Sequence, residues 1–172
     1  FEKILLTTEG LKNLEELQEQ KEKRKKGSGD EARCSMTDPE ARNLKMADGG
    51  FRPASNVQFA TDGDSRIIVA FDVTNNGSDG GQMAPMHEHV VESYGKVPEN
   101  YTVDGGFSTN DDITKVEKGG SKVAAPMTHE DRILKRDGDP HERRKGDSDE
   151  MAAFRDRMRS DEAKAVLKRR PS

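Results

Sequence analysis

The large apolar side chains of this chain gather in its middle, and this clustering limits where a core can form. Of the 29 Leu, Ile, Val and Phe residues, 16 lie between residues 51 and 127. They make up about 17% of the 172 residues, below the ~20% at which a chain struggles to fill a core. The net charge of −4 is too small for outright disorder. We therefore expect a helical, charged linker over 1–36, a core over 37–127, and a charged loop with helices over 128–172.

Several classes of protein are excluded by what the sequence lacks. No apolar run approaches the ~18 residues of a membrane span, and no basic stretch followed by an apolar one suggests a secretory signal. The single cysteine, Cys34, cannot form an internal disulfide, which excludes a disulfide-stapled scaffold. We expect a cytoplasmic protein with no membrane partner. Because the chain begins at Phe1 rather than at a methionine, we also expect a piece of something longer or a trimmed product.

The first arm is predicted to be a helix with a narrow apolar stripe. Leu11, Leu14 and Leu17 recur every three residues, and Thr8 is placed to cap the helix start. From 18 to 26 every residue is polar, and Gly-Ser-Gly at 27–29 ends the pattern. We expect this helix to run over a surface as a connector.

The middle of the chain changes to the period of strands. Apolar residues alternate with their neighbours over 56–61 and 66–74, and the turn-forming residues 62–65 between them predict a hairpin. Met residues at helical spacing predict a helix over 82–94 whose apolar side carries Met83, Met86, Val90 and Tyr94, and Gly95 ends it.

The elements that follow set the expected fold class. We expect a strand over 101–103, a helix over 110–119 capped by Thr109 or Asn110, and a strand over 122–126. Strands joined through helices imply parallel crossovers, so the predicted fold is α/β, a mixed sheet with flanking helices. The last arm is expected to hold a loop over 137–147 and helices over 149–159 and 161–169, capped by Ser148 and Ser160.

Asp104 is the most informative candidate for chemistry. It lies at the carboxyl end of a short apolar strand, where ligands of open α/β sheets gather, and two glycines follow it. A carboxylate there can bind a divalent metal; the alternative is an ordinary Asp-Gly turn. Asp72 and Asp79 are placed to approach it, although Asp72 can instead point to solvent and Asp79 can cap the next helix. The acidic pair 111–112 suits the first turn of a helix.

Other familiar sites are absent from the sequence. His87 and His89 are two apart, which on a helix points them to different faces, and no cysteine pair accompanies them, so a zinc site is not expected. There is no nucleophile elbow, phosphate-binding loop or dinucleotide fingerprint. The basic clusters at 143–145 and 168–170 can touch phosphates or can simply form a solvated face.

Several short motifs occur in an order typical of one enzyme family. They are TDPEAR at 37–42, NVQFATD at 56–62, IIVA at 67–70, VTN at 73–75 with Asp79, and VDGGF at 103–107. In this stretch, about 35–126, the chain resembles the DDE transposases of bacterial insertion sequences, apart from Ser55, where the family usually has Tyr. The resemblance implies an RNase H-like fold and an enzyme that cuts and joins DNA with three carboxylates and two Mg²⁺ or Mn²⁺ ions.

The resemblance also implies which parts of the site this chain holds. Asp104 matches the second carboxylate of the family, with Asp79 a further possible ligand. Leu167–Arg170 resembles the signature before the third carboxylate, with Leu167 in place of Tyr; Lys168, Arg169 and Arg170 are candidates for DNA contact. The first carboxylate and its central strand, and the third carboxylate, are expected outside this chain. We therefore expect unpaired edges at 56–61 and 101–104, no cleavage by this chain alone, and a homo-oligomer in the complete enzyme.

Two other functions remain open from the sequence. One is a non-catalytic remnant that binds nucleic acid or another partner. The other is a complete metal-dependent nuclease that uses Asp72 or Asp79 beside Asp104. The second requires the carboxylates to lie within reach of a shared metal ion.

Overall fold

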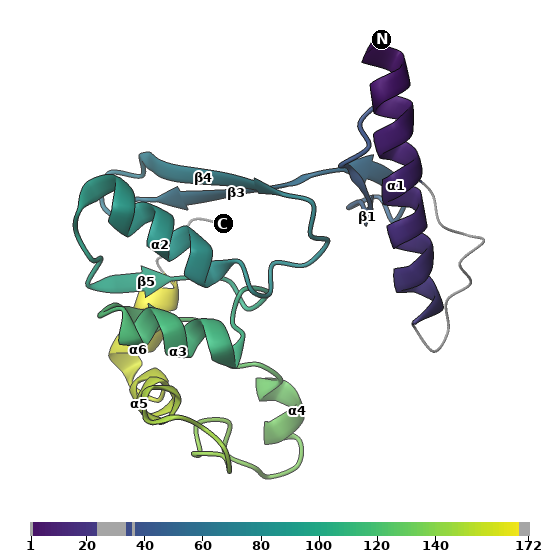
Figure 1. The fold of residues 1–172 in the computed structure, drawn as a ribbon. Helices are drawn as coiled ribbons and strands as arrows, with labels where there is room; N and C mark the ends of the chain where they lie inside the picture. The colour runs from purple at the N-terminus through teal and green to yellow at the C-terminus, as the bar shows by residue number, and fades with distance from the viewer. Residues whose placement is uncertain (1, 24–33, 36, 169–172) are drawn as a thin grey trace. The chain divides into compact units, whose positions relative to one another are not determined.

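The computed structural model describes residues 2–23, 34–35 and 37–168, and these residues form six helices and three two-stranded sheets (Figure 1). The protein is therefore of the mixed α/β class. The described strands pair two by two, and the mixed sheet expected from the sequence does not form as one continuous sheet among these residues. The chain divides into two compact units, Phe1–Gln58 with Val73–Gly77 and Phe59–Asp72 with Ser78–Ser172.

The first unit contains the long helix α1 (Glu2–Glu22) and a hairpin that the sequence did not predict. Because α1 begins at Glu2, the cap expected at Thr8 is wrong: the good helix formers before Thr8 extend the helix. The predicted stop at 27–29 lies outside the described residues. Strands β1 (Arg42–Lys45) and β2 (Phe51–Ala54) pair antiparallel around Gly49, whose φ of 82° suits glycine. Strand β1 contains one apolar residue, Leu44, so its sequence shows no alternation of apolar and polar residues that would predict a strand.

The predicted hairpin of the middle zone is confirmed as β3 (Asn56–Thr61) and β4 (Ile68–Thr74), which run in opposite directions (Figure 1). Asp62 closes its turn by accepting hydrogen bonds from the Ser65 N–H at 2.8 Å and hydroxyl at 2.6 Å. The buried positions of the hairpin are not its large apolar ones: Gln58 and Ala70 are 6% and 7% exposed, whereas Phe59 and Phe71 are 60% and 61% exposed. Asp72 shares the side of Ala70 and is half-buried.

The second unit holds the core. Helix α2 (Met83–Tyr94) ends at Gly95 with φ 62°, as predicted, and its Met86 and Val90 pack against Ala70. Tyr94 was expected on the buried side but is 54% exposed, with its hydroxyl donating to the Val69 carbonyl at 2.9 Å. The main cluster of buried side chains is formed by several helices, one strand and the loop after that strand. Its large members are Met83, Ile113, Val116, Val123, Met127, Met151, Phe154 and Met158.

The parallel crossover predicted from the element order is confirmed. Strands β5 (Asn100–Thr102) and β6 (Lys122–Ala124) pair in parallel, with Tyr101 opposite Val123, and α3 (Asn110–Lys118) connects them. Helices α5 (Asp149–Met158) and α6 (Asp161–Lys168) begin where expected, because Ser148 and Ser160 accept the capping bonds. The short α4 (Glu130–Leu134) was not predicted, since five residues carry too little periodicity.

Candidate functional site

Asp104 lies at the carboxyl end of β5, in an exposed turn. The Val103 N–H donates to the Ala124 carbonyl at 3.0 Å, which continues the parallel pairing up to the residue before Asp104. The Phe107 N–H then donates to the Asp104 carbonyl at 3.0 Å and closes the turn. Asp104 thus ends a strand, as one alternative from the sequence expects, and begins a tight turn, as the other expects. The hydrogen bond that closes the turn is accepted by its backbone carbonyl.

Asp79 lies beside the turn that carries Asp104. A Cβ built on Gly106 would stand 3.2 Å from Asp79 Oδ2, and one built on Gly80 would stand 3.3 Å from Thr109 Cγ2. The loop before α2 and the loop after β5 thus pack closely, and the missing side chain at Gly106 leaves room for the Asp79 carboxylate. The structure therefore places Asp79 against the turn that begins at Asp104. The residue at the α2 N-cap is Gln82, so Asp79 does not hold the capping position.

A third acidic residue, Asp112, joins these two loops, and sequence reasoning missed this role. Its side chain is buried, at 2% exposed. Its Oδ2 accepts from the Gly81 N–H and from the Thr109 hydroxyl, both at 2.8 Å, and its Oδ1 accepts from the Ala84 N–H at 3.4 Å. Asp112 therefore caps α2 from across the fold while Thr109 caps α3.

The sequence carries a local signal for part of the role of Asp112. The other part depends on Gly81, which is distant in sequence. The Thr109-x-x-Asp112 spacing is that of a reciprocal N-terminal cap, which the sequence predicted only as favourable first-turn charge. Gly81, with φ 88°, turns its N–H towards the carboxylate, and that partner is 31 residues away in sequence. We consider Asp112 a positioning residue for Asp79 and Asp104.

The buried histidine of this unit belongs to the packing. His87 Nε2 lies 2.7 Å from Ser121 Oγ, whose hydroxyl donates to the Pro98 carbonyl, and the His87 ring meets Tyr101 edge-on at 5.3 Å. Burial lowers the pKa of His87 and raises that of Tyr101 to about 12. His89 is exposed, so the expectation that the two histidines face different sides is confirmed.

The remaining candidates are spread over the chain. Lys168 is the exposed last residue of α6, and Arg169 and Arg170 lie outside the described residues. Leu167 packs against the main core cluster. Among the described residues, no three His, Cys, Asp or Glu side chains are grouped closely enough to hold a metal ion. Asp79 and Asp104 offer the hard carboxylate oxygens that Mg²⁺ and Mn²⁺ prefer.

No helix in the described part of the chain has the length and apolar content to cross a bilayer. No protein-family model, curated protein or solved structure matches the chain.

Proposed function

We propose that this chain is part of a DDE transposase, with an RNase H-like core that cuts and joins DNA. The observation that carries the proposal is the strand-end position of Asp104 with Asp79 packed beside its turn. The order of elements supports it: an antiparallel hairpin, a helix, and a parallel strand pair joined by a helix. The proposed fold has one further strand beside β3 and β5, which agrees with finding their pairs as separate sheets.

The proposed chemistry divides the work between this chain and the rest of the enzyme. Two divalent ions, when bound, would activate the attacking oxygen and stabilise the leaving oxygen of a phosphodiester. Asp104, and Asp79 beside it, would supply carboxylate ligands, and the other carboxylates would come from outside the described residues. Asp112 would hold the two ligand loops together through its bonds to Gly81 and Thr109.

The first test of this proposal is metal-dependent strand cleavage. The 172-residue chain is expected not to nick supercoiled plasmid in Mg²⁺ or Mn²⁺, and nicking that EDTA stops would contradict the proposed division of the site. The chain extended by its own flanking coding sequence is expected to cleave. Asp104→Asn should abolish that cleavage, whereas Asp111→Asn, an exposed carboxylate in the first turn of α3, should leave it unchanged. Equal activity of Asp104→Asn and the unmodified protein would remove the basis of the proposal.

A second candidate, a non-catalytic remnant that binds a partner, is favoured by one observation. Phe59, Ile67 and Phe71 of the β3–β4 hairpin are 60%, 64% and 61% exposed, more apolar surface than an isolated exposed residue presents. This candidate predicts that the extended protein binds its partner or DNA normally after Asp104→Asn and never cleaves. The cleavage assay therefore separates the two functions.

A further inference from the structure

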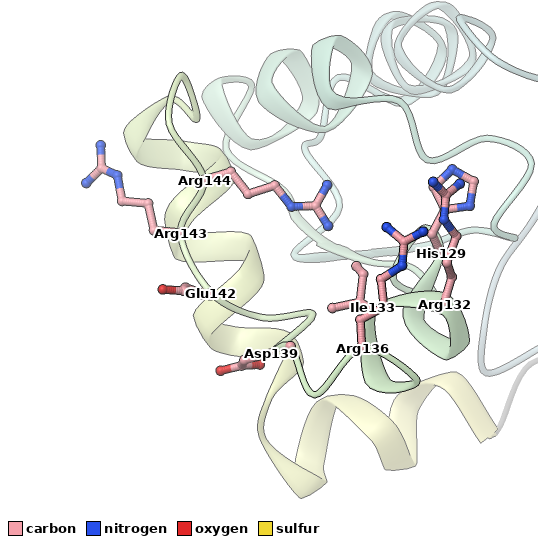
Figure 2. A pocket seen from close by; sticks show the side chains of 9 residues that line it. His129, Arg132, Ile133, Arg136, Asp139, Glu142, Arg143 and Arg144 are labelled. Atoms are coloured by element: carbon pink, nitrogen blue, oxygen red, sulfur yellow. The ribbon is translucent and has the colours of Figure 1, made fainter.

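A cavity of about 420 Å³ opens in the second unit between α4 and the loop that precedes α5. Figure 2 shows the side chains that line it: His129, Arg132, Ile133, Arg136, Asp139, Glu142, Arg143 and Arg144. Four of these are arginines, and they come from two segments that the sequence separates by several residues. We call this cavity the arginine pocket.

Within the described part of the chain, three of the lining arginines form no side-chain ion pair, although the Asp147 carboxylate, which accepts from the Arg144 N–H, also attracts the Arg144 charge. Arg132, Arg136 and Arg144 form no ion pair among the described residues, and all three are exposed. Arg144 extends towards the side of the pocket where Arg132, Arg136 and His129 lie, whereas the carboxylates of Asp139 and Glu142 point the other way (Figure 2).

Two of the other charged lining residues are already paired, whereas Glu142 forms no ion pair among the described residues. Arg143 binds Asp149 at 2.9 Å, and Asp139 binds Arg159 at 2.7 Å. The charges of Arg143 and Asp139 are thereby neutralised, and the Glu142 carboxylate points away from Arg132 and Arg136 (Figure 2). The side of the pocket that the three arginines without ion pairs line is therefore positive. An anion entering there would meet three guanidinium groups and an imidazole.

The loop that presents Arg144 is held by a buried ion pair. Asp147 Oδ2 accepts from Arg155 Nε at 2.7 Å and from the Arg144 N–H at 2.8 Å, and the Asp147 and Arg155 side chains are each 3% exposed. Arg155 Nη1 also donates to the Pro140 carbonyl at 3.3 Å. A pocket wall fixed before binding loses less entropy when a ligand arrives, which favours a site over an accidental cluster of charge.

The other wall packs equally closely. A Cβ on Gly138 would stand 2.9 Å from Ile133 Cγ2, so only glycine lets the loop lie this near to α4. Gly138 N–H donates to the Ile133 carbonyl at 3.1 Å, which fixes the approach. The loop at Gly138 is therefore held against α4 by close packing and a backbone hydrogen bond.

We propose that the arginine pocket binds phosphate groups of a nucleic-acid strand. Guanidinium groups match the oxygens of a phosphate with two parallel hydrogen bonds, and several arginines without acidic partners are the usual means of holding one. A cavity of this size accepts a group larger than a single phosphate, such as a nucleotide of a strand. The choice of nucleic acid over another phosphate carrier rests on the proposed function.

The test measures binding of a fluorescein-labelled DNA duplex and a labelled single strand to the 172-residue chain, over a series of salt concentrations and in EDTA. Arg144→Gln alone should weaken binding about tenfold, as expected for one lost charge-assisted contact. The triple variant Arg132→Gln, Arg136→Gln and Arg144→Gln should lower the slope of log affinity against log salt by up to about 3, since each phosphate contact on duplex contributes about 0.9.

The matched control changes charge equally but outside the pocket. Lys96→Gln, Lys135→Gln and Lys145→Gln together remove three exposed positive charges that do not line the cavity, and they should reduce the slope much less. Thermal unfolding of each variant shows whether it is folded, and Arg144→Gln alone keeps the test valid if the triple variant is not.

Two results would overturn the inference. Equal losses in the pocket and control variants would show that only overall charge matters. Inorganic phosphate can also be added to the thermal unfolding measurement. If phosphate raises the unfolding temperature of the unmodified chain but neither DNA binds, the ligand of the pocket is a small phosphate compound. The binding test is carried out in EDTA and so does not depend on metal-dependent cleavage. If DNA binding is absent, the cleavage test of Asp104 is still valid. If cleavage is absent, the DNA contact measured at the arginine pocket is still valid.

Discussion

Replacing Asp112 with alanine should separate the two loops that hold Asp79 and Asp104. The change removes two short hydrogen bonds to a carboxylate, from the Gly81 N–H and the Thr109 hydroxyl, and one longer bond from the Ala84 N–H. A hydrogen bond to a charged group contributes roughly 1.5–3 kcal/mol, and the Gly81 N–H would lose the partner that the buried Asp112 carboxylate supplies. The 3.4 Å bond contributes little, and removing the carboxylate also removes the free-energy cost of burying it. We therefore expect Asp112→Ala to lower the free energy of unfolding by about 3 kcal/mol.

Asp111 provides the control, because it lies in the same first turn of α3 but is exposed. Asp111→Ala should cost only about 0.5 kcal/mol, the usual effect of losing a negative charge near a helix start. Urea denaturation followed by circular dichroism measures both values, and a difference of this size is a large part of the stability of a domain. Equal losses in Asp111→Ala and Asp112→Ala would refute the bridging role, and with it the positioning of the candidate site.

Three further predictions concern other parts of the second unit. Arg155→Met leaves its buried aspartate partner unpaired and should lower the free energy of unfolding by about 3–5 kcal/mol, whereas Arg143→Met, which breaks an exposed pair, should cost less than about 1 kcal/mol in the same urea titration. Gly81→Ala forces an alanine to φ 88° in open space and should cost about 1–2 kcal/mol; Gly63→Ala, also in open space but without a positive φ, should cost nothing measurable by thermal unfolding. Burial lowers the pKa of His87 below its ordinary 6.5. Below pH 6.5 the unfolded chain therefore binds a proton at His87 more readily than the folded chain does. The folded state loses free energy of unfolding as the pH falls through this range. The thermal midpoint of His87→Gln should therefore depend less on pH across this range, and an unchanged pH dependence would contradict the assignment.

The sequence by itself determined the elements whose signals are local. The alternation over 56–61 and 66–74, the Met spacing of α2 and the hydroxyl caps at Thr109 and Ser148 each act within a few residues. Each of these elements formed as predicted, because a cap or a turn is satisfied by its own neighbours. The same local order placed Asp104 at the end of a strand.

Only the tertiary structure decided which faces were buried and which distant groups met. The hairpin buries Ala70 and exposes Phe71 because Met86 and Val90 of α2 fill the space beside the small residues. Alternation identifies two faces of a strand but not the one that a helix will cover. Asp112 reaches Gly81 across 31 residues, and Arg144 lines one pocket with Arg132 and Arg136 in a loop that the buried Asp147–Arg155 pair holds. Such contacts depend on packing between segments, and packing is a property of the whole fold that no short stretch of sequence carries.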